Sequence, residues 1–205
     1  MMNRDHIIDV YLRTFRIMKS SFAGLILLIF VLCMQGSSLR AQPPYEVRDG
    51  IVTFLSDAPL ERITATSKLL KGIIDHNQRT FAFALDIASF QGFNSPLQRV
   101  HFNENYMESG DFPVATFAGK FIEDVDLSVD GTYEVRVKGK LTIHGVEKER
   151  IIKATVRVEN GTIYIDSRFT VLLEDHDIRI PKVVLQKIAK IVNVDVSASL
   201  VLGKS

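Results

Sequence analysis

The segment Gly131–Val146, GTYEVRVKGKLTIHGV, indicates the fold class through its alternation of residue types. Tyr133, Val135 and Val137 share one side of an extended chain, and charged residues occupy the positions between them. A period of two, with one apolar and one charged face, is typical of a strand in an antiparallel sheet with one solvated side. The His-Gly pair at 144–145 favours a two-residue hairpin turn, because glycine readily takes a positive φ.

The same alternation recurs from Pro43 onward, between turn signals such as Asp130-Gly131 and Asn160-Gly161. The spacing of these turns leaves strands of about 9–11 residues, which suit a closed wall better than a sandwich. The eight expected strands are residues 51–56, 62–71, 79–88, 115–122, 132–142, 149–158, 162–172 and 191–202. Eight strands enclose an interior just wide enough for one small ligand. The predicted fold class is therefore all-β, an eight-stranded antiparallel barrel.

Two segments interrupt this pattern and are expected to form short helical excursions. Residues 89–113 include an expected helix around 97–102, and residues 181–190 begin with Pro181, which fits a first helical turn. The first excursion contains the aromatic residues Phe90, Phe93, Phe102, Tyr106 and Phe112. These rings either plug one end of the barrel as ordinary core or line the mouth of an apolar cavity. Binding an apolar chain needs no motif, since each buried methylene contributes about 0.8 kcal/mol.

Residues 1–41 have the layout of a secretory signal. Three basic residues precede the uncharged run 22–34, and a small residue stands at position 41. A spanning helix needs about 20 apolar residues, so this run is too short to cross a membrane. We therefore expect a cleaved signal peptide over 1–41, with Met18 as an alternative start, and a mature domain over 42–205 without a membrane span. An uncleaved anchor helix is the alternative interpretation.

Composition and charge exclude several classes of function. The chain has 25 Lys and Arg against 24 Asp and Glu, but five of these basic and two of these acidic residues lie in 1–41, so residues 42–205 carry a charge of −2. Nucleic-acid binding usually requires a clustered basic excess, so we expect no nucleic-acid partner. Cys33 is the single cysteine and lies in the signal segment, which excludes a disulfide framework and a Cys-ligated zinc site.

The sequence shows no motif for catalysis or metal binding. G-x-S-x-G, H-E-x-x-H and the Walker loop do not occur. His76, His101, His144 and His176 are too far apart in the sequence to form a local metal-binding pair. We interpret the acidic cluster around His176 as a solvated loop and His144 as a hairpin-turn residue. We expect no catalytic residue, no metal and no cofactor.

Three strings of this sequence resemble the YceI-like family of exported bacterial proteins. They are His101–Ser109 (HFNENYMES), Asp111–Phe117 (DFPVATF) and, above all, Gly131–Val146. Asp177–Pro181, followed by an amphipathic turn and a Val-rich last strand, also fits. The resemblance extends over residues 50–202, although the family's opening string, S-x-V-x-F-x-[IV]-x-H, is missing.

The resemblance implies a lipocalin-like barrel, periplasmic or secreted, without metal or catalysis. Its apolar lumen is expected to hold a polyisoprenoid or another long-chain amphiphile, for transport or storage in the cell envelope. The expected lining comes from the strand walls, the first excursion and the hairpins. Its residues are Phe83, Phe102, Tyr106, Phe117, Phe121, Val137, Ile143 and Phe169.

Two other classes of function stay open from the sequence. One is a small histidine- or metal-dependent envelope enzyme that uses His101, His144 and His176. The other is a structural, stress-related envelope factor whose barrel is solidly packed and holds no cargo. A long-chain lipid is the expected partner, and a homodimer stays among the expected assemblies.

Overall fold

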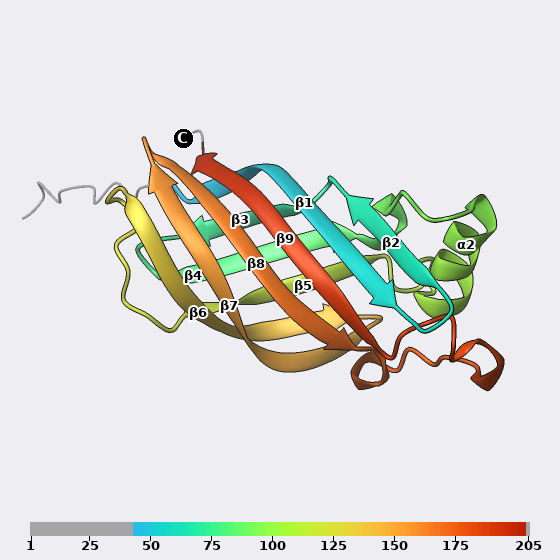
Figure 1. The fold of residues 1–205 in the computed structure, drawn as a ribbon. Helices are drawn as coiled ribbons and strands as arrows, with labels where there is room; N and C mark the ends of the chain where they lie inside the picture. Colours follow the sequence, from blue (N-terminus) through green and yellow to red (C-terminus); the bar gives the residue numbers. More distant parts are fainter. Residues whose placement is uncertain (1–42, 204–205) are drawn as a thin grey trace, which may run out of the picture. The chain divides into compact units, whose positions relative to one another are not determined.

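An antiparallel β-sheet wraps into a barrel in the computed structural model, which describes residues 43–203 (Figure 1). The strands of this sheet are β1 (Tyr45–Asp57), β2 (Arg62–Ser67), β3 (Lys71–Asp75), β4 (Thr80–Asp86), β5 (Val114–Phe121), β6 (Gly131–Ile143), β7 (Val146–Glu159), β8 (Thr162–Leu172) and β9 (Ile191–Leu202). The predicted signal peptide, residues 1–41, lies outside the described residues.

Strand β1 closes the barrel because it is paired along both of its edges. One edge pairs with β9, from Tyr45↔Leu202 to Leu55↔Asn193. The other edge pairs first with β3 and then with β2, and the partners follow one continuous register. Strands β2 and β3 therefore occupy a single position in the wall, which gives eight positions in all. The predicted eight-stranded antiparallel barrel is confirmed.

The second wall position differs from its prediction because it is interrupted at residues 68–70. Residues 62–71 were expected to form one strand, but β2 ends at Ser67 and β3 begins at Lys71. Strand β3 pairs with β4. Strand β2 instead meets the segment after β4, through two hydrogen bonds between the backbones of Thr66 and Gln91, at 2.8 and 3.0 Å. The wall thus spreads open beside β2, and the first excursion fills the gap.

The sheet is interrupted a second time between the first half of β7 and the second half of β8. We call this interruption the seam. The two strands pair from Ala154↔Ser167 to Glu159↔Thr162, and then diverge. The Arg150 guanidinium spans the seam by donating to the Thr170 carbonyl at 2.8 Å. The short helix η3 (Leu173–His176) also packs against β7 at this place. Side chains therefore replace part of the backbone ladder here.

Two of the three predicted hairpin turns form as expected. His144-Gly145 and Asn160-Gly161 both have positive φ at both residues, between 51° and 73°, and each joins strands that pair directly beside the turn. Such turns match the right-handed twist of the strands. The expectation for Asp130-Gly131 is wrong: Gly131 opens β6, and the connection from β5 is the nine-residue loop 122–130.

The first strand also begins earlier than the predicted residue 51. Residues 45–50 pair with β9 and β3, although a register shift between Val47 and Asp49 disturbs their alternation. A β-bulge of this kind places two residues opposite one and hides the period of two in the sequence. The apolar residues before residue 51 therefore gave no clear strand signal.

Short helices account for the two predicted excursions. In the first, Ser95 caps α2 (Pro96–His101) by accepting from the Gln98 amide at 3.2 Å, and a π-helical turn, η2 (Phe102–Tyr106), follows. The remaining short elements are η1 (Ile87–Ser89) and η4 (Lys182–Val184), which begins directly after Pro181. Within residues 43–203, no helix has the length and apolar character required to cross a membrane.

Glycines at inward positions let aromatic rings lie against the wall. Gly119 on β5 pairs with Gly139 on β6, and a Cβ on Gly119 would meet the Lys138 carbonyl at 2.1 Å. The Phe117 ring covers Gly139, where a Cβ would meet it at 2.9 Å. Because these strands approach so closely, larger residues would force the sheet apart or push the rings into the lumen.

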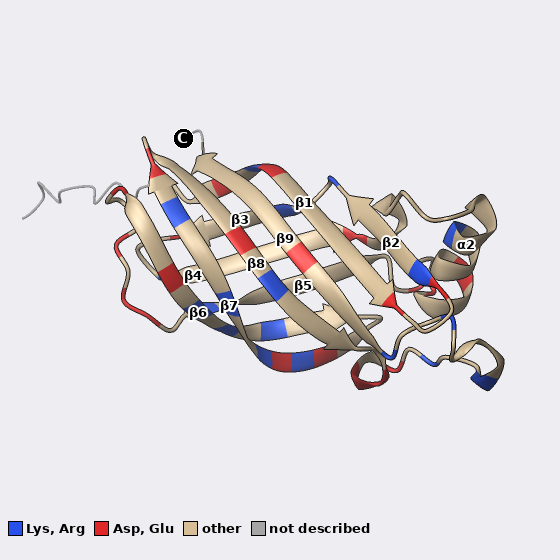
Figure 2. Cartoon of the chain, viewed as in Figure 1, with Lys and Arg blue, Asp and Glu red and all other residues tan. Residues whose placement is uncertain are grey.

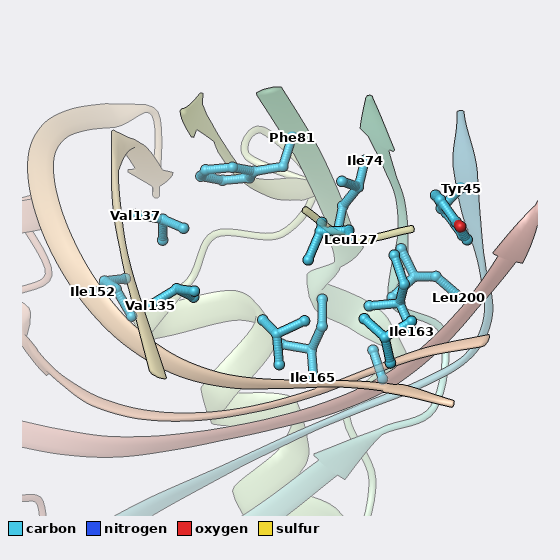
Figure 3. Close-up of a cluster of buried hydrophobic side chains, with 13 residues drawn as sticks. Tyr45, Ile74, Phe81, Leu127, Val135, Val137, Ile152, Ile163, Ile165 and Leu200 are labelled. Atoms are coloured by element: carbon cyan, nitrogen blue, oxygen red, sulfur yellow. The ribbon is translucent and has the colours of Figure 1, made fainter. Parts of the chain in front are cut away.

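One end of the barrel is filled by side chains around Leu127, which is 3% exposed. Leu127 belongs to loop 122–130, and Figure 3 shows it among apolar side chains from the surrounding strands. We call this cluster the plug: Tyr45, Leu127, Val158, Ile163 and Leu200. The plug residues are buried together and therefore seal this end of the barrel.

Two carboxylates hold the loop that carries Leu127. Glu123 accepts from the Arg136 backbone at 2.5 Å and from its Nε at 2.7 Å, and these bonds lower the pKa of Glu123 below its ordinary 4.5. Hydrogen bonds from the Ser128 hydroxyl and amide likewise lower the pKa of Asp126 below 3.8. A lowered folded pKa stabilises the protein above the ordinary value, and that stabilisation is lost as the pH falls through the folded value.

We therefore predict that the melting temperature falls as the pH is lowered from about 5 to about 3, and that Glu123→Gln shows a smaller fall. The amide cannot gain a proton in this range, so its contribution does not change. Thermal unfolding followed by circular dichroism measures both curves. Parallel curves for the variant and the wild type would show that Glu123 is not linked to folding.

Candidate functional site

The barrel encloses a cavity of about 630 Å³, within the range of small-molecule sites. All nine strands contribute to its lining, as do the first excursion and the segment between β8 and β9. The lining is mainly Phe, Leu, Ile, Val and Ala, as the inward faces of the strands predict. None of the five plug residues lines it, so the plug ends the cavity as solid core.

The structure places all eight predicted lining residues around this one cavity. They are Phe83, Phe102, Tyr106, Phe117, Phe121, Val137, Ile143 and Phe169. The inward phase of β5, ambiguous in the sequence, puts Phe117, Gly119 and Phe121 on the lumen side. Their position is thus established, whereas contact with a ligand stays a prediction.

An aromatic cluster forms the cavity wall near α2. The Phe54 ring stacks on Phe102, with centroids 5.3 Å apart and planes inclined by 14°. Phe90 and Phe93 meet both of these rings edge-on or tilted, at 5.0 to 5.9 Å. All four rings line the cavity. The aromatic residues of the first excursion therefore pack as core and border the cavity at the same time, except for Phe112, which meets the His144 ring edge-on.

The cavity opens at the α2 end of the barrel, where lining residues reach the solvent. Leu97 lines the cavity and is 61% exposed, and His101 and Lys187 are also exposed there. The side-chain amide of Gln98 donates to the Glu61 carboxylate at 2.8 Å across the same opening. The cavity thus combines an apolar interior with a polar rim.

Sequence reasoning missed this polar rim. Glu61 and Gln98 are 37 positions apart, and neither belongs to an alternating strand face that marks the lumen. The sequence marks His101 only as a candidate metal ligand or catalytic residue. No sequence signal brings these residues together, because the β1–β2 turn and α2 meet through the folding of the first excursion.

Tyr106 contributes the one phenol among the predicted lining residues. Burial raises the pKa of Tyr106 above its ordinary 10.0, because the charged phenolate would lose water. The hydroxyl is therefore neutral at physiological pH and serves as a hydrogen-bond donor or acceptor beside the apolar lining.

His176 is fully buried, which corrects the interpretation of its segment as a solvated loop. Its Nδ1 lies 3.0 Å from the Val146 carbonyl, at the seam between β7 and β8. His144 lies beside it: Nδ1 is 3.1 Å from the His176 carbonyl, and Nε2 is 2.8 Å from a carboxylate oxygen of Glu108. These contacts tie the β6–β7 turn to η3 and to the end of the first excursion.

The three histidines of the enzyme hypothesis therefore do not converge on one site. His101 lies at the opening, whereas the contact between His144 and His176 runs from ring to backbone carbonyl. In the described part of the chain, no three His, Cys, Asp or Glu residues gather in a way that would hold a metal ion.

Known proteins share this barrel and its sequence pattern. The family model of the YceI-like domain matches residues 52–200. The chain belongs to the YceI-like family. The resemblance seen in the sequence is thereby confirmed. A search of curated proteins found no match.

Two solved structures resemble this YceI-like barrel. A polyisoprenoid binding domain from Saccharophagus degradans, implicated in plant cell wall breakdown, aligns with a TM-score of 0.67 and 18% identity, covering 79% of this chain and all of that one. BcnA from Burkholderia cenocepacia aligns with a TM-score of 0.62 and 17% identity, covering 73% of this chain and 95% of that one. At these identities the likeness establishes the fold.

We predict that His144→Ala destabilises the YceI-like barrel by about 1–2 kcal/mol. The change leaves the His176 carbonyl without its ring donor and removes the contact with Glu108. Urea unfolding gives the free energy. His101→Ala, at the exposed rim, is the control and should change it by less than about 0.5 kcal/mol. Equal effects of the two changes would contradict a role for His144 in fastening the seam.

Proposed function

We propose that this YceI-like protein is an exported lipid-binding barrel that holds a polyisoprenoid or another long-chain amphiphile in its lumen. The observation that carries this proposal is the apolar cavity of about 630 Å³, sealed by the plug and open beside α2. The eight lining residues from Phe83 to Phe169 are the proposed ligand contacts.

The energetics of burial favour an apolar chain as the ligand. Each methylene removed from water contributes about 0.8 kcal/mol, so a fifteen-carbon tail contributes roughly 12 kcal/mol before ordering costs. A cavity lined by Phe, Leu, Ile and Val offers few partners for a polar ligand, which would lose hydrogen bonds to water on entry. The interior therefore suits a hydrocarbon tail.

The polar rim suits the head of an amphiphile. Glu61, Gln98, His101 and Lys187 line the open end, and they supply both hydrogen-bond donors and acceptors. A tail directed toward the plug leaves its head group among these side chains. The name of the Saccharophagus degradans domain, a polyisoprenoid binding domain, supports the same class of ligand.

Binding, rather than catalysis, accounts for the arrangement of polar groups in this barrel. The enzyme hypothesis requires His101, His144 and His176 to converge on a substrate, but their contacts separate them into a rim residue and two seam residues. The hypothesis of a cargo-free structural factor requires a solid core, whereas the lumen contains an open cavity.

The proposal includes export to the periplasm or beyond, with transport or storage of lipid as the role. Its support is the signal-like sequence of residues 1–41, with the uncharged run 22–34 after three basic residues. A homodimer belongs to the same set of proposals, and its test is the mass of the native protein.

We predict that the protein purified from its own host carries a lipid. Native mass spectrometry should show a mass above that of the bare chain, and organic extraction should release a long-chain compound. The same spectrum reports whether the N-terminal segment has been removed and whether two chains associate. A bare-chain mass with an empty extract would overturn the carrier proposal.

Three variants test whether the ligand binds in the lumen. Phe169→Asp places a carboxylate in the cavity and should lower lipid occupancy at least about tenfold, because an unpaired charge is costly in an apolar site. Thr170→Asp is the control, since residue 170 follows on the same strand and is exposed. Ala154→Phe fills the cavity without adding charge, so it tests the site even if the first variant does not fold. Wild-type occupancy in a folded Ala154→Phe protein would contradict a lumen site.

A further inference from the structure

A basic segment crosses the open end of the barrel between β8 and β9. Residues 179–190, RIPKVVLQKIAK, contain four Lys or Arg and no Asp or Glu. We call this segment the mouth strap. It includes η4, which lies beyond the strand ends on the side of α2 (Figure 1).

Hydrogen bonds fix the mouth strap across the opening. The Leu60 amide donates to the Gln186 carbonyl at 2.8 Å, and the Ala189 amide donates to the Ser56 hydroxyl at 2.9 Å. At its end, the Lys190 carbonyl accepts from the Leu173 amide at 3.0 Å. The strap is therefore attached to the β1–β2 turn on one side and to the end of β8 on the other.

The mouth strap has an inner and an outer face. Val184, Lys187 and Ile188 line the cavity. Val183, by contrast, is 88% exposed, and Leu185 is also exposed. The strap thus separates the cavity from a second apolar surface that faces the solvent.

Neighbouring segments extend this outer apolar surface around the opening. Leu60 in the β1–β2 turn is 67% exposed, and Leu97 in α2 is 61% exposed. Their segments meet the strap and each other through the Leu60–Gln186 and Gln98–Glu61 hydrogen bonds. Exposed aliphatic side chains gathered around a ligand opening mark an interaction site.

The basic side chains of the strap have no acidic partner among the residues that the structure describes. In residues 43–203, none of the four forms a salt bridge. Acidic residues do precede the strap: Glu174 and Asp175 belong to η3, which packs against β7 (Figure 2), and Asp177 follows η3 but forms no salt bridge with the strap. Elsewhere on the outer wall, Lys and Glu alternate and pair, as Lys138 does with Glu149. The strap therefore combines unpaired positive charge with exposed apolar groups.

We infer that the mouth strap docks the open end of the barrel on an anionic lipid bilayer. Aliphatic side chains flanked by Lys and Arg bind such surfaces because the apolar groups enter the interface while the cations meet lipid head groups. Docking in this orientation brings the cavity opening to the membrane. The inference extends the proposed function, since it names the surface from which a lipid would enter.

Vesicle flotation tests this inference with protein purified from its host. Vesicles of phosphatidylcholine and phosphatidylglycerol in equal parts are compared with pure phosphatidylcholine vesicles. We expect the wild type to float with the anionic vesicles at low salt and to be released at high salt, where surface attraction is screened. Lys182→Glu combined with Val183→Asp should lower the bound fraction at least about tenfold.

A matched control changes the same residue types on the outer wall of β7. Ile151→Asp combined with Lys153→Glu alters an aliphatic residue that is 60% exposed and an exposed lysine away from the opening. This control should float as the wild type does. Because all proteins share the same N-terminal segment, the difference between the two double variants isolates the strap.

Three results would overturn docking: no flotation of the wild type, equal flotation with both kinds of vesicle, or equal loss in both double variants. The first would leave a protein partner as the occupant of this surface. Native mass spectrometry of the same samples separates the two proposals. A variant that retains its lipid but does not float contradicts neither of them, whereas a lipid-free wild type that floats contradicts the lumen site alone.

Discussion

The fold depends on the pairing of β1 along both of its edges. This strand joins β9 on one side and the interrupted β2–β3 position on the other, so the sheet has no free edge at its closure. Once the wall closes, every second side chain of each strand faces the same interior. Small residues at several of these positions, including Ala115, Ala154 and Ala198, leave that interior only partly filled. The cavity is therefore a consequence of barrel closure and residue size, without any dedicated binding element.

The features that follow from local alternation could be predicted from the sequence. Strand β6 and its hairpin partner β7 show a clear period of two, and the turn at 144–145 has the residues that positive φ requires. The same phase was sufficient to place Val137 and Phe169 in the lumen. Residues on a strand face are positioned by the strand itself, so their location needs no knowledge of distant contacts.

The features that depend on contacts between distant segments could not be predicted. Leu127 seals the barrel from a loop that mixes acidic and apolar residues, and the Asp130-Gly131 pair suggested a tight turn instead. The burial of His176 follows from the divergence of β7 and β8, which opens the seam where its ring meets the Val146 carbonyl. In each case a backbone group or an apolar gap, created by the closed sheet, is satisfied by a residue from elsewhere in the chain.

The plug also gives the lumen a fixed depth. A tunnel open at both ends accepts a chain of any length, but a tunnel with one sealed end accommodates only a tail that matches its depth. A tail that is too long leaves methylenes in water, each forgoing about 0.8 kcal/mol, and a tail that is too short leaves lining residues without contacts. For the proposed amphiphile, we then expect affinity to peak at one chain length. Under the proposed function, the position of Leu127 at the sealed end would set that length.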